Sequence, residues 1–134
     1  MSNEFRGNGN LAENPAIKTV TVDGEERKLA EMRIFFDRLR QDGDGGLADK
    51  GGFWLDVTAW GNDLAERCGK LLRKGARLHV VGELQQQKWT SKESGEEKNA
   101  MQLNASEVYL GLSRVESVTY KERKTAAERD SEAA

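Results

Sequence analysis

The sequence predicts an all-β chain with one helix, arranged as a five-stranded Greek-key barrel with the helix between the third and fourth strands. Several segments alternate between apolar and polar residues, which is the pattern of half-buried strands. One segment, near residues 62–74, instead places apolar residues at helical spacing. The 134 residues are enough for one modest core with tails but not for two cores. We therefore expect one domain over residues 1–112 and a short, charged, disordered tail over residues 113–134.

The first two strands are expected to form a hairpin. Residues 17–22 alternate, and Asp23-Gly24 follows them as a dipeptide typical of a two-residue hairpin turn. The second strand covers residues 29–40, and its inward side carries Ala30, Met32, Ile34 and Phe36. A helix is the competing interpretation, because Met, Leu, Arg and Glu favour helices. The neighbouring Phe35 and Phe36 favour the strand.

The third strand carries tryptophans on its polar side. It is preceded by residues 41–52, whose five glycines and three aspartates predict a mobile loop. The strand covers residues 53–60, and its apolar side consists of Phe53, Leu55, Val57 and Ala59. Trp54 and Trp60 lie on the other side, about 20 Å apart at a rise of roughly 3.3 Å per residue. Flat, exposed rings on a polar sheet suit the unstacked bases of a single-stranded nucleic acid.

A helix of about three turns is expected after the third strand. Asn62 is its expected N-cap, and Gly75 is its expected terminator. The apolar stripe of this helix consists of Leu64, Cys68, Leu71 and Leu72. A single stripe of this width predicts a helix that packs one face against the barrel.

Two further strands complete the barrel. The fourth covers residues 76–90, in which Gly82 predicts a bulge or a sharp bend. After a polar loop at residues 91–97, the fifth strand covers residues 98–108 with three inward residues, Met101, Leu103 and Ala105. Five strands with one helix after the third is the order of the OB-fold, a small barrel whose outer face and loops bind oligonucleotides.

Basic residues gather in clusters although the formal net charge is −2. The negative total argues mildly against a nucleic-acid partner, but the distribution of charge matters more than the total. One cluster is Arg27, Lys28, Arg33, Arg38 and Arg40, and a second is Lys70, Arg73, Lys74 and Arg77. Lys88 and Lys92 flank Trp89. A solvated face explains any single cluster equally well, whereas bases interleaved with aromatic residues favour nucleic acid.

No residue pattern indicates catalysis, a metal site or a cofactor. His79 is the sole histidine and lies on the polar side of a strand, without the partners that catalysis needs. Cys68 is the sole cysteine and is expected to be a small buried hydrophobe. No spacing typical of metal ligands is present. Without an apolar run of membrane length, a signal-peptide core or paired cysteines, the chain is expected to be cytoplasmic.

Several short motifs occur in order along residues 7–110. They are Gly9-Asn10-Leu11, Pro15, the run from Trp54 to Val57, Trp60-Gly61, Leu64-Ala65-Glu66, Leu72-Arg73-Lys74-Gly75, Val80-Val81-Gly82-Glu83-Leu84 and Lys88-Trp89-Thr90. With these motifs the chain resembles the bacterial single-stranded DNA-binding protein family. The resemblance implies an OB-fold without catalytic activity that wraps single-stranded DNA, usually as a homotetramer and in some members as a dimer. The N-terminal strand, around residues 5–11, is the segment expected to pair across a two-fold axis.

The resemblance also implies roles for individual residues. The family stacks bases on aromatic residues at the positions matched by Trp54, Trp60 and Trp89, and Arg40 stands where another tryptophan is usual. An arginine plane can also stack on a base. The full set of expected DNA-binding residues is Trp54, Trp60, Trp89, Arg40, Arg33, Arg38, Phe35, Lys88, Lys92, Arg73 and Lys74.

The expected function is sequence-tolerant binding and protection of single-stranded DNA during replication, recombination, repair or element transfer. Replication or recombination proteins are further candidate partners. The chain ends in acids without the apolar tip that family members use for recruitment, so it resembles compact versions carried by phages, plasmids or integrated elements. Two alternatives stay open: RNA binding by the same surface, and an OB-fold protein-interaction module in a replication or conjugation assembly. Any one tryptophan could also cover an interface or pack under a loop.

Overall fold

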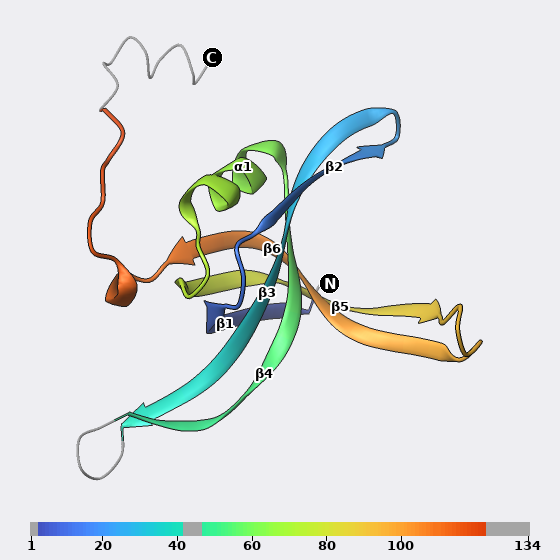
Figure 1. Ribbon diagram of the computed structural model, residues 1–134, viewed down its shortest axis with the longest axis horizontal. Coiled ribbons are helices and arrows are strands. Elements are labelled where there is room, and N and C mark those ends of the chain that lie inside the picture. Colours follow the sequence, from blue (N-terminus) through green and yellow to red (C-terminus); the bar gives the residue numbers. More distant parts are fainter. Residues whose placement is uncertain (1–2, 42–46, 123–134) are drawn as a thin grey trace.

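One closed sheet and one α-helix are the main elements of the described part of the chain (Figure 1). The computed structural model describes residues 3–41 and 47–122, and the side chains of residues 38–50 also lie outside the described part. The strands within these ranges are β1 (Glu4–Leu11), β2 (Ala16–Val22), β3 (Glu25–Gln41), β4 (Leu47–Trp60), β5 (Arg77–Thr90) and β6 (Glu97–Leu110). Helix α1 (Asn62–Leu71) lies between β4 and β5, and a short 3-10 helix, η1 (Leu112–Arg114), follows β6.

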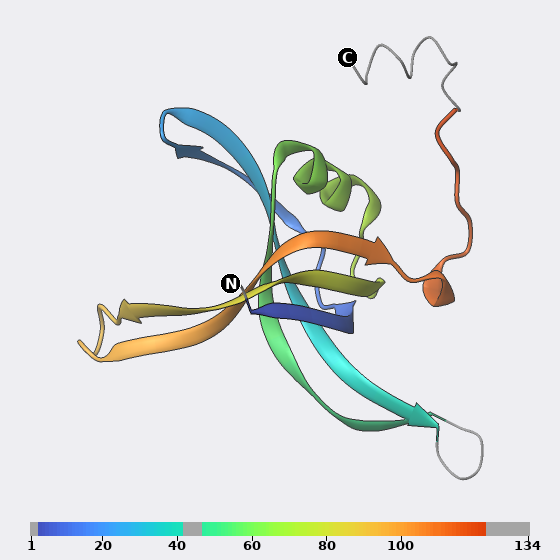
Figure 2. The ribbon, with the colours of Figure 1, turned by 180° about the vertical axis from the view of Figure 1, so that it is seen from behind.

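The pairing of β1 with two strands closes the barrel. The strands are hydrogen-bonded in the order β1-β5-β6-β4-β3-β2, and β1 also pairs with β3. Residues 4–10 of β1 pair with β5, whereas only residues 9–11 pair with β3. Figure 2 shows β1 beside β5 on the back of the barrel. The predicted fold class is confirmed. The structure has one strand more than the five expected, β1 at the N-terminus. The helix expected after the third strand therefore follows β4 in chain order.

Alternation along the strands builds the core, as expected for half-buried strands. The larger buried side chains of the barrel interior are Leu11, Met32, Ile34, Phe36, Leu55, Val57, Leu78, Val80 and Leu103. Helix α1 adds Ala65 and Cys68 to this cluster. Burial raises the pKa of the Cys68 thiol, in keeping with an inert, packed side chain.

Three hairpins continue beyond the barrel as arms: β2–β3, β3–β4 and β5–β6 (Figure 1). The predicted turn at Asp23-Gly24 is confirmed: Val22 pairs with Glu25, and the φ angles of the two turn residues are 52° and 81°. Two positive φ angles are what a tight hairpin turn of this kind requires. The arms continue the alternation into regions where no core lies behind the sheet.

Three side chains that were expected in the core are exposed, because no core lies behind the sheet or helix at their positions. Phe53 is 47% exposed and Met101 is 46% exposed, because both precede the stretch, residues 56–59 and 102–105, over which β4 and β6 pair in the barrel. Phe53 packs against two other rings at this end, Phe5 at 6.0 Å and Phe36 at 5.9 Å between centroids. Leu71, on the last turn of α1, is 60% exposed, while Leu72 just beyond the helix is buried.

The helix starts at Asn62, at the predicted position, but its predicted N-cap is wrong by one residue and its predicted end by a few. Gly61 is the N-cap residue, and the Asn62 side chain instead accepts a hydrogen bond from the Lys28 backbone N–H at 2.8 Å. This bond ties the start of α1 to β3. The helix ends at Leu71, before the predicted terminator Gly75, whose N–H donates to the Leu11 carbonyl at 2.7 Å. The chain thus leaves the helix early to bury Leu72.

The glycine-rich segment 41–52 is mostly strand rather than loop. β3 runs to Gln41 and β4 starts at Leu47, with a register irregularity between Asp37 and Leu39. Residues 42–46, the centre of the predicted loop, lie outside the described residues, as do residues 123–134 of the predicted disordered tail. The bulge predicted at Gly82 is confirmed, since the pairing of β5 with β6 shifts between Val81 and Gly82. A Cβ at Gly82 would collide with the backbone of Asn104, which explains the need for glycine there.

Candidate nucleic-acid interface

The outward side of four neighbouring strands forms a continuous polar face. In the register of the sheet, Arg33 of β3 lies opposite Asp56 of β4, and Asp56 lies beside Gln102 of β6. Gln102 in turn lies opposite Gln85 of β5. Residues paired across adjacent strands share a face. The four side chains therefore form one polar row across β3, β4, β6 and β5.

Trp54 lies next to this row with an aromatic ring and a cation beside it. Its side is confirmed as the exposed one, with 49% of the residue accessible. Phe35, directly opposite on β3, has its ring centroid 5.1 Å from that of Trp54. The Arg33 Cζ atom lies 5.3 Å from the Trp54 ring centroid, within the range of a cation–π contact. Phe35, Trp54 and Arg33, all expected site residues, are thus brought together.

Trp60 lies on the same side of β4, six residues further on. It is 43% exposed and pairs in register with Leu29 of β3. The ammonium of the neighbouring Lys28 is held by Glu66 of α1, at 2.6 Å between Nζ and Oε1. Trp60 therefore has a half-exposed ring on the polar face, but the nearby lysine is already paired.

Trp89 faces an open groove of about 400 Å³ beside the barrel. The β5–β6 arm contributes Trp89 and Gln87 to this groove, and the barrel contributes Arg33 and Asp56. In the groove, the Gln102 amide donates to the Thr58 hydroxyl at 2.6 Å, so that the polar lining is ordered. Trp89 is 49% exposed. The groove brings together two expected site residues, Arg33 and Trp89, that are far apart in the sequence.

The other basic residues expected to bind DNA do not gather at the groove. The Arg73 guanidinium donates to the Gly69 and Leu72 carbonyls, at 3.1 and 2.8 Å, and so caps the end of α1. Arg73 and Lys74 line a separate hollow and are not brought to the groove. Lys88 and Lys92 are exposed on the β5–β6 arm, where Lys88 alternates with Trp89. The side chains of Arg38 and Arg40 lie outside the described residues, although both backbones belong to β3.

Acidic partners on this face were not anticipated from the sequence. Lys18 is paired with Glu31 at 2.8 Å, and Arg33 is paired with Asp56 at 2.7 Å. Both acids lie on the groove lining. The register of β3 with β4 creates the second pair, and nothing in the sequence around Arg33 marks a residue of another strand as its partner. The positive charge of the basic clusters seen in the sequence is therefore partly neutralised by carboxylates in the fold.

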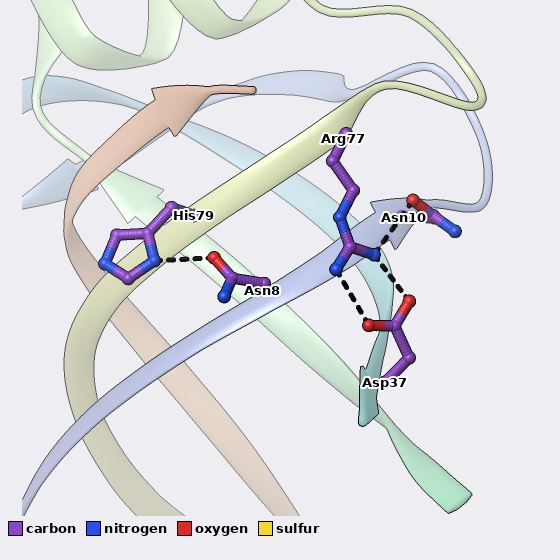
Figure 3. Close-up of polar contacts among 5 residues, drawn as sticks. All are labelled: Asn8, Asn10, Asp37, Arg77 and His79. Atoms are coloured by element: carbon purple, nitrogen blue, oxygen red, sulfur yellow. Dashed lines mark hydrogen bonds and ion pairs between the residues drawn. The ribbon is translucent and has the colours of Figure 1, made fainter. Parts of the chain in front are cut away.

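A second unanticipated group clamps the barrel where β1 closes it (Figure 3). Arg77 of β5 donates two hydrogen bonds to Asp37 of β3, at 2.5 and 2.8 Å, and a longer one to Asn10 of β1 at 3.3 Å. The hydrogen bond with Asp37, assisted by its charge, raises the pKa of Arg77, while partial burial opposes the shift. Beside this clamp, the His79 ring is 2.7 Å from the Asn8 side-chain oxygen. Arg77 and His79 thus have structural partners.

The described residues show neither a metal-binding cluster nor a membrane-spanning helix. Residues 3–41 and 47–122 contain no group of three or more His, Cys, Asp or Glu side chains placed to hold a metal ion. None of the helices in these ranges is both long enough and apolar enough to span a bilayer.

Comparisons with known proteins agree on one family. Residues 3–110 match the family described as "Single-strand binding protein family". Single-stranded DNA-binding protein 2 of Nostoc sp. is 38% identical over 68 residues, covering 49% of this chain and 52% of that protein. The single-stranded DNA-binding protein of Treponema pallidum is 26% identical over 126 residues, covering 90% and 67%. The match thus spans about half of the Nostoc relative's length.

Solved structures show the same fold. A Plasmodium falciparum SSB in complex with ssDNA superposes with a TM-score of 0.65 at 22% identity, covering 82% of this chain and 95% of that one. A small single-stranded DNA-binding protein from Streptomyces coelicolor gives 0.68 at 17% identity, covering 86% and 99%. The structural likeness identifies the barrel as an OB-fold, as predicted. Together with the match over residues 3–110, it establishes that the chain belongs to the single-strand binding protein family.

Proposed function

We propose that this protein binds single-stranded DNA without sequence preference, stacking bases on Trp54, Trp60 and Trp89. The observation that carries the proposal is the groove between barrel and β5–β6 arm, whose lining includes both a half-exposed tryptophan, Trp89, and an arginine, Arg33. Base–aromatic stacking tolerates any sequence because every base has a flat face. Family membership supports the same ligand.

Basic residues along the face are proposed to contact phosphates. Arg33 lies over the Trp54 ring, and Lys88 and Lys92 are exposed lysines close to Trp89 in the sequence. Arg38 and Arg40 stay candidates because their strand, β3, continues from this face. Arg73 and Lys74 are weaker candidates, since they lie on another hollow.

The proposed role is protection of single strands in the cytoplasm during replication, recombination, repair or element transfer. No catalytic step is part of this role, and the family is one of DNA-binding proteins. We propose residues 1–112 as the binding domain and residues 113–134 as a tail. Replication or recombination proteins are candidate partners of the complex.

Self-association is also proposed, as a homotetramer with a dimer as the alternative. Residues 4–8 of β1 pair with β5 on one edge, and in the described part of the chain their other edge is not used by β3. An unpaired strand edge is a ready site for pairing with a second copy. Light scattering at micromolar protein concentration tests this proposal, and a monomer would contradict it.

Titration of the intrinsic tryptophan fluorescence tests the DNA-binding proposal. The full chain is titrated with oligo-dT, with a duplex of equal length and with a single-stranded RNA. We expect quenching by oligo-dT at much lower concentrations than by duplex, with affinity that falls as salt rises. Equal affinity for duplex would contradict the proposal. Stronger binding of RNA would favour the RNA alternative, and no response to any nucleic acid would favour a protein-interaction module.

A further inference from the structure

One face of the half-exposed Trp54 indole lies under a side chain that a second residue holds in place. Arg33 lies over the ring, with its Cζ atom 5.3 Å from the centroid. Its Nη1 atom donates to Asp56 Oδ1 at 2.7 Å. Asp56 lies directly opposite Arg33 in the strand register, so the fold itself brings the carboxylate within reach.

A base cannot stack on the ring face that Arg33 covers until the guanidinium moves. Phe35 packs beside the same indole, at 5.1 Å between centroids and with the rings inclined by 53°. A DNA phosphate offers the guanidinium the same kind of anionic oxygens as a carboxylate, in the same bidentate geometry. Arg33 therefore has two competing anions, one built into the protein and one on the ligand.

We propose that Asp56 is a built-in competitor of the DNA phosphate, which holds Arg33 over Trp54 and so weakens single-strand binding. This inference rests on the proposed function. On binding, Arg33 exchanges the Asp56 carboxylate for a phosphate and uncovers the indole for a base. Asp56 acts through Arg33 and is thus a positioning residue that limits affinity.

The exposure of the pair makes such an exchange inexpensive. The Arg33 and Asp56 side chains are 52% and 64% exposed. Exposed pairs of this kind are weak, because water and salt screen both charges. A ligand phosphate can therefore displace the carboxylate, and removal of the carboxylate should strengthen binding by a moderate factor.

The first test compares D56N with D63N in the full chain. Asp63 forms a pair of the same kind with Arg67, at 3.1 Å on the exposed surface of α1, and it does not line the groove. Both variants remove one negative charge. We expect D56N to bind oligo-dT roughly two- to five-fold more tightly at low salt, and D63N to bind like the wild type. A second replacement, D56S, should reproduce the gain if the lost charge causes it.

The second test repeats D56N in an R33M background. If Asp56 acts by holding Arg33, the gain from D56N should fall to less than half of its value when Arg33 is absent. An equal gain in both backgrounds would overturn the inference, because Asp56 would then only repel phosphates. Weaker binding of D56N than of the wild type would also overturn it, because the carboxylate would then help Arg33 to bind.

The wild type separates this inference from the proposed function. Wild-type binding of oligo-dT with no difference between D56N and D63N would refute the competitor role alone. Absence of any wild-type binding would refute both. Melting temperatures of all variants, measured alongside, report whether each remains folded.

Discussion

Two arginine–aspartate pairs in this protein have the same chemistry and opposite surroundings. Arg77 and Asp37 share two hydrogen bonds, and their side chains are 22% and 7% exposed. Arg33 and Asp56 share one, with side chains 52% and 64% exposed. The first pair joins β5 to β3 where β1 closes the barrel, and the second joins neighbouring strands on the open face. The buried first pair is a fixed part of the fold, because losing one partner would leave an unpaired buried charge. The exposed second pair is weak, so another anion can displace its carboxylate.

The same division runs along β4 from one residue to the next. Leu55 is 6% exposed and belongs to the core, whereas Trp54 beside it is 49% exposed on the polar face. Side chains alternate because successive Cβ atoms of a strand point to opposite faces. Leu55 therefore contributes to the core of the fold, whereas the proposed stacking on a base falls to its neighbour Trp54 on the other face.

The largest effect is expected from truncating the core side of β4. L55A should lower the free energy of unfolding by about 2–5 kcal/mol, because it leaves a cavity in a closed barrel. W54A should cost less, about 1 kcal/mol, because Trp54 is half exposed and loses only its contacts with Phe35 and Arg33. Urea denaturation at one fixed protein concentration measures both, since self-association would also shift the midpoint. An equal loss in the two variants would mean that Trp54 is part of the fold.

Breaking the buried pair should have the next largest effect. D37N leaves the Arg77 guanidinium partly buried without its carboxylate, which should cost about 2–3 kcal/mol of stability. D56N is the matched control on the exposed face and should cost less than about 1 kcal/mol. The same denaturation series compares them. Equal costs would show that burial does not distinguish the two pairs.

The alternating segments made most of the fold predictable from the sequence. The inward residues of β3, the turn at Asp23-Gly24 and the bulge at Gly82 all follow from local patterns, and the structure confirms them. Alternation says nothing about where the barrel stops, however. Phe53 and Met101 were therefore expected inside, but they precede the paired stretch of β4 and β6 and are exposed.

The candidate site was predictable in its aromatic half only. The exposed side of Trp54 and Trp60 follows from period-two alternation within one strand. The acids that neutralise the bases do not, because Asp56 meets Arg33 through the register of two strands. Arg73 looked like a DNA-binding base by its neighbours in the sequence, but its carbonyl partners are set by where α1 ends. Such partners are products of tertiary structure.

Replacing any of the three tryptophans should lower DNA affinity, whereas replacing Leu55 should lower stability. W54A, W60A and W89A should each weaken oligo-dT binding by about 1–3 kcal/mol, the usual contribution of one stacked base. Y120A is the control, because Tyr120 is an aromatic residue that is 88% exposed beyond the barrel. Fluorescence anisotropy of a labelled oligo-dT measures affinity without relying on the tryptophans removed. If a tryptophan variant unfolds yet keeps its affinity per folded molecule, that residue is structural.

The smallest expected effect is a change in the salt dependence of affinity. It distinguishes a basic side chain that is free to contact phosphate from one that is bonded within the fold. Lys88 is exposed on the β5–β6 arm next to Trp89, whereas the Arg73 guanidinium is held by two carbonyls at the end of α1. For a single strand, the logarithm of affinity falls with the logarithm of salt by about 0.7 per phosphate contacted. K88Q should therefore reduce that slope by about 0.7 if Lys88 contacts one phosphate. R73Q removes the same charge and should leave the slope unchanged, with a loss of stability of about 0.5–1 kcal/mol instead. A slope reduced equally by both variants would mean that Arg73 releases its carbonyls to contact a phosphate. The bound single-stranded DNA would then pass along the hollow beside α1.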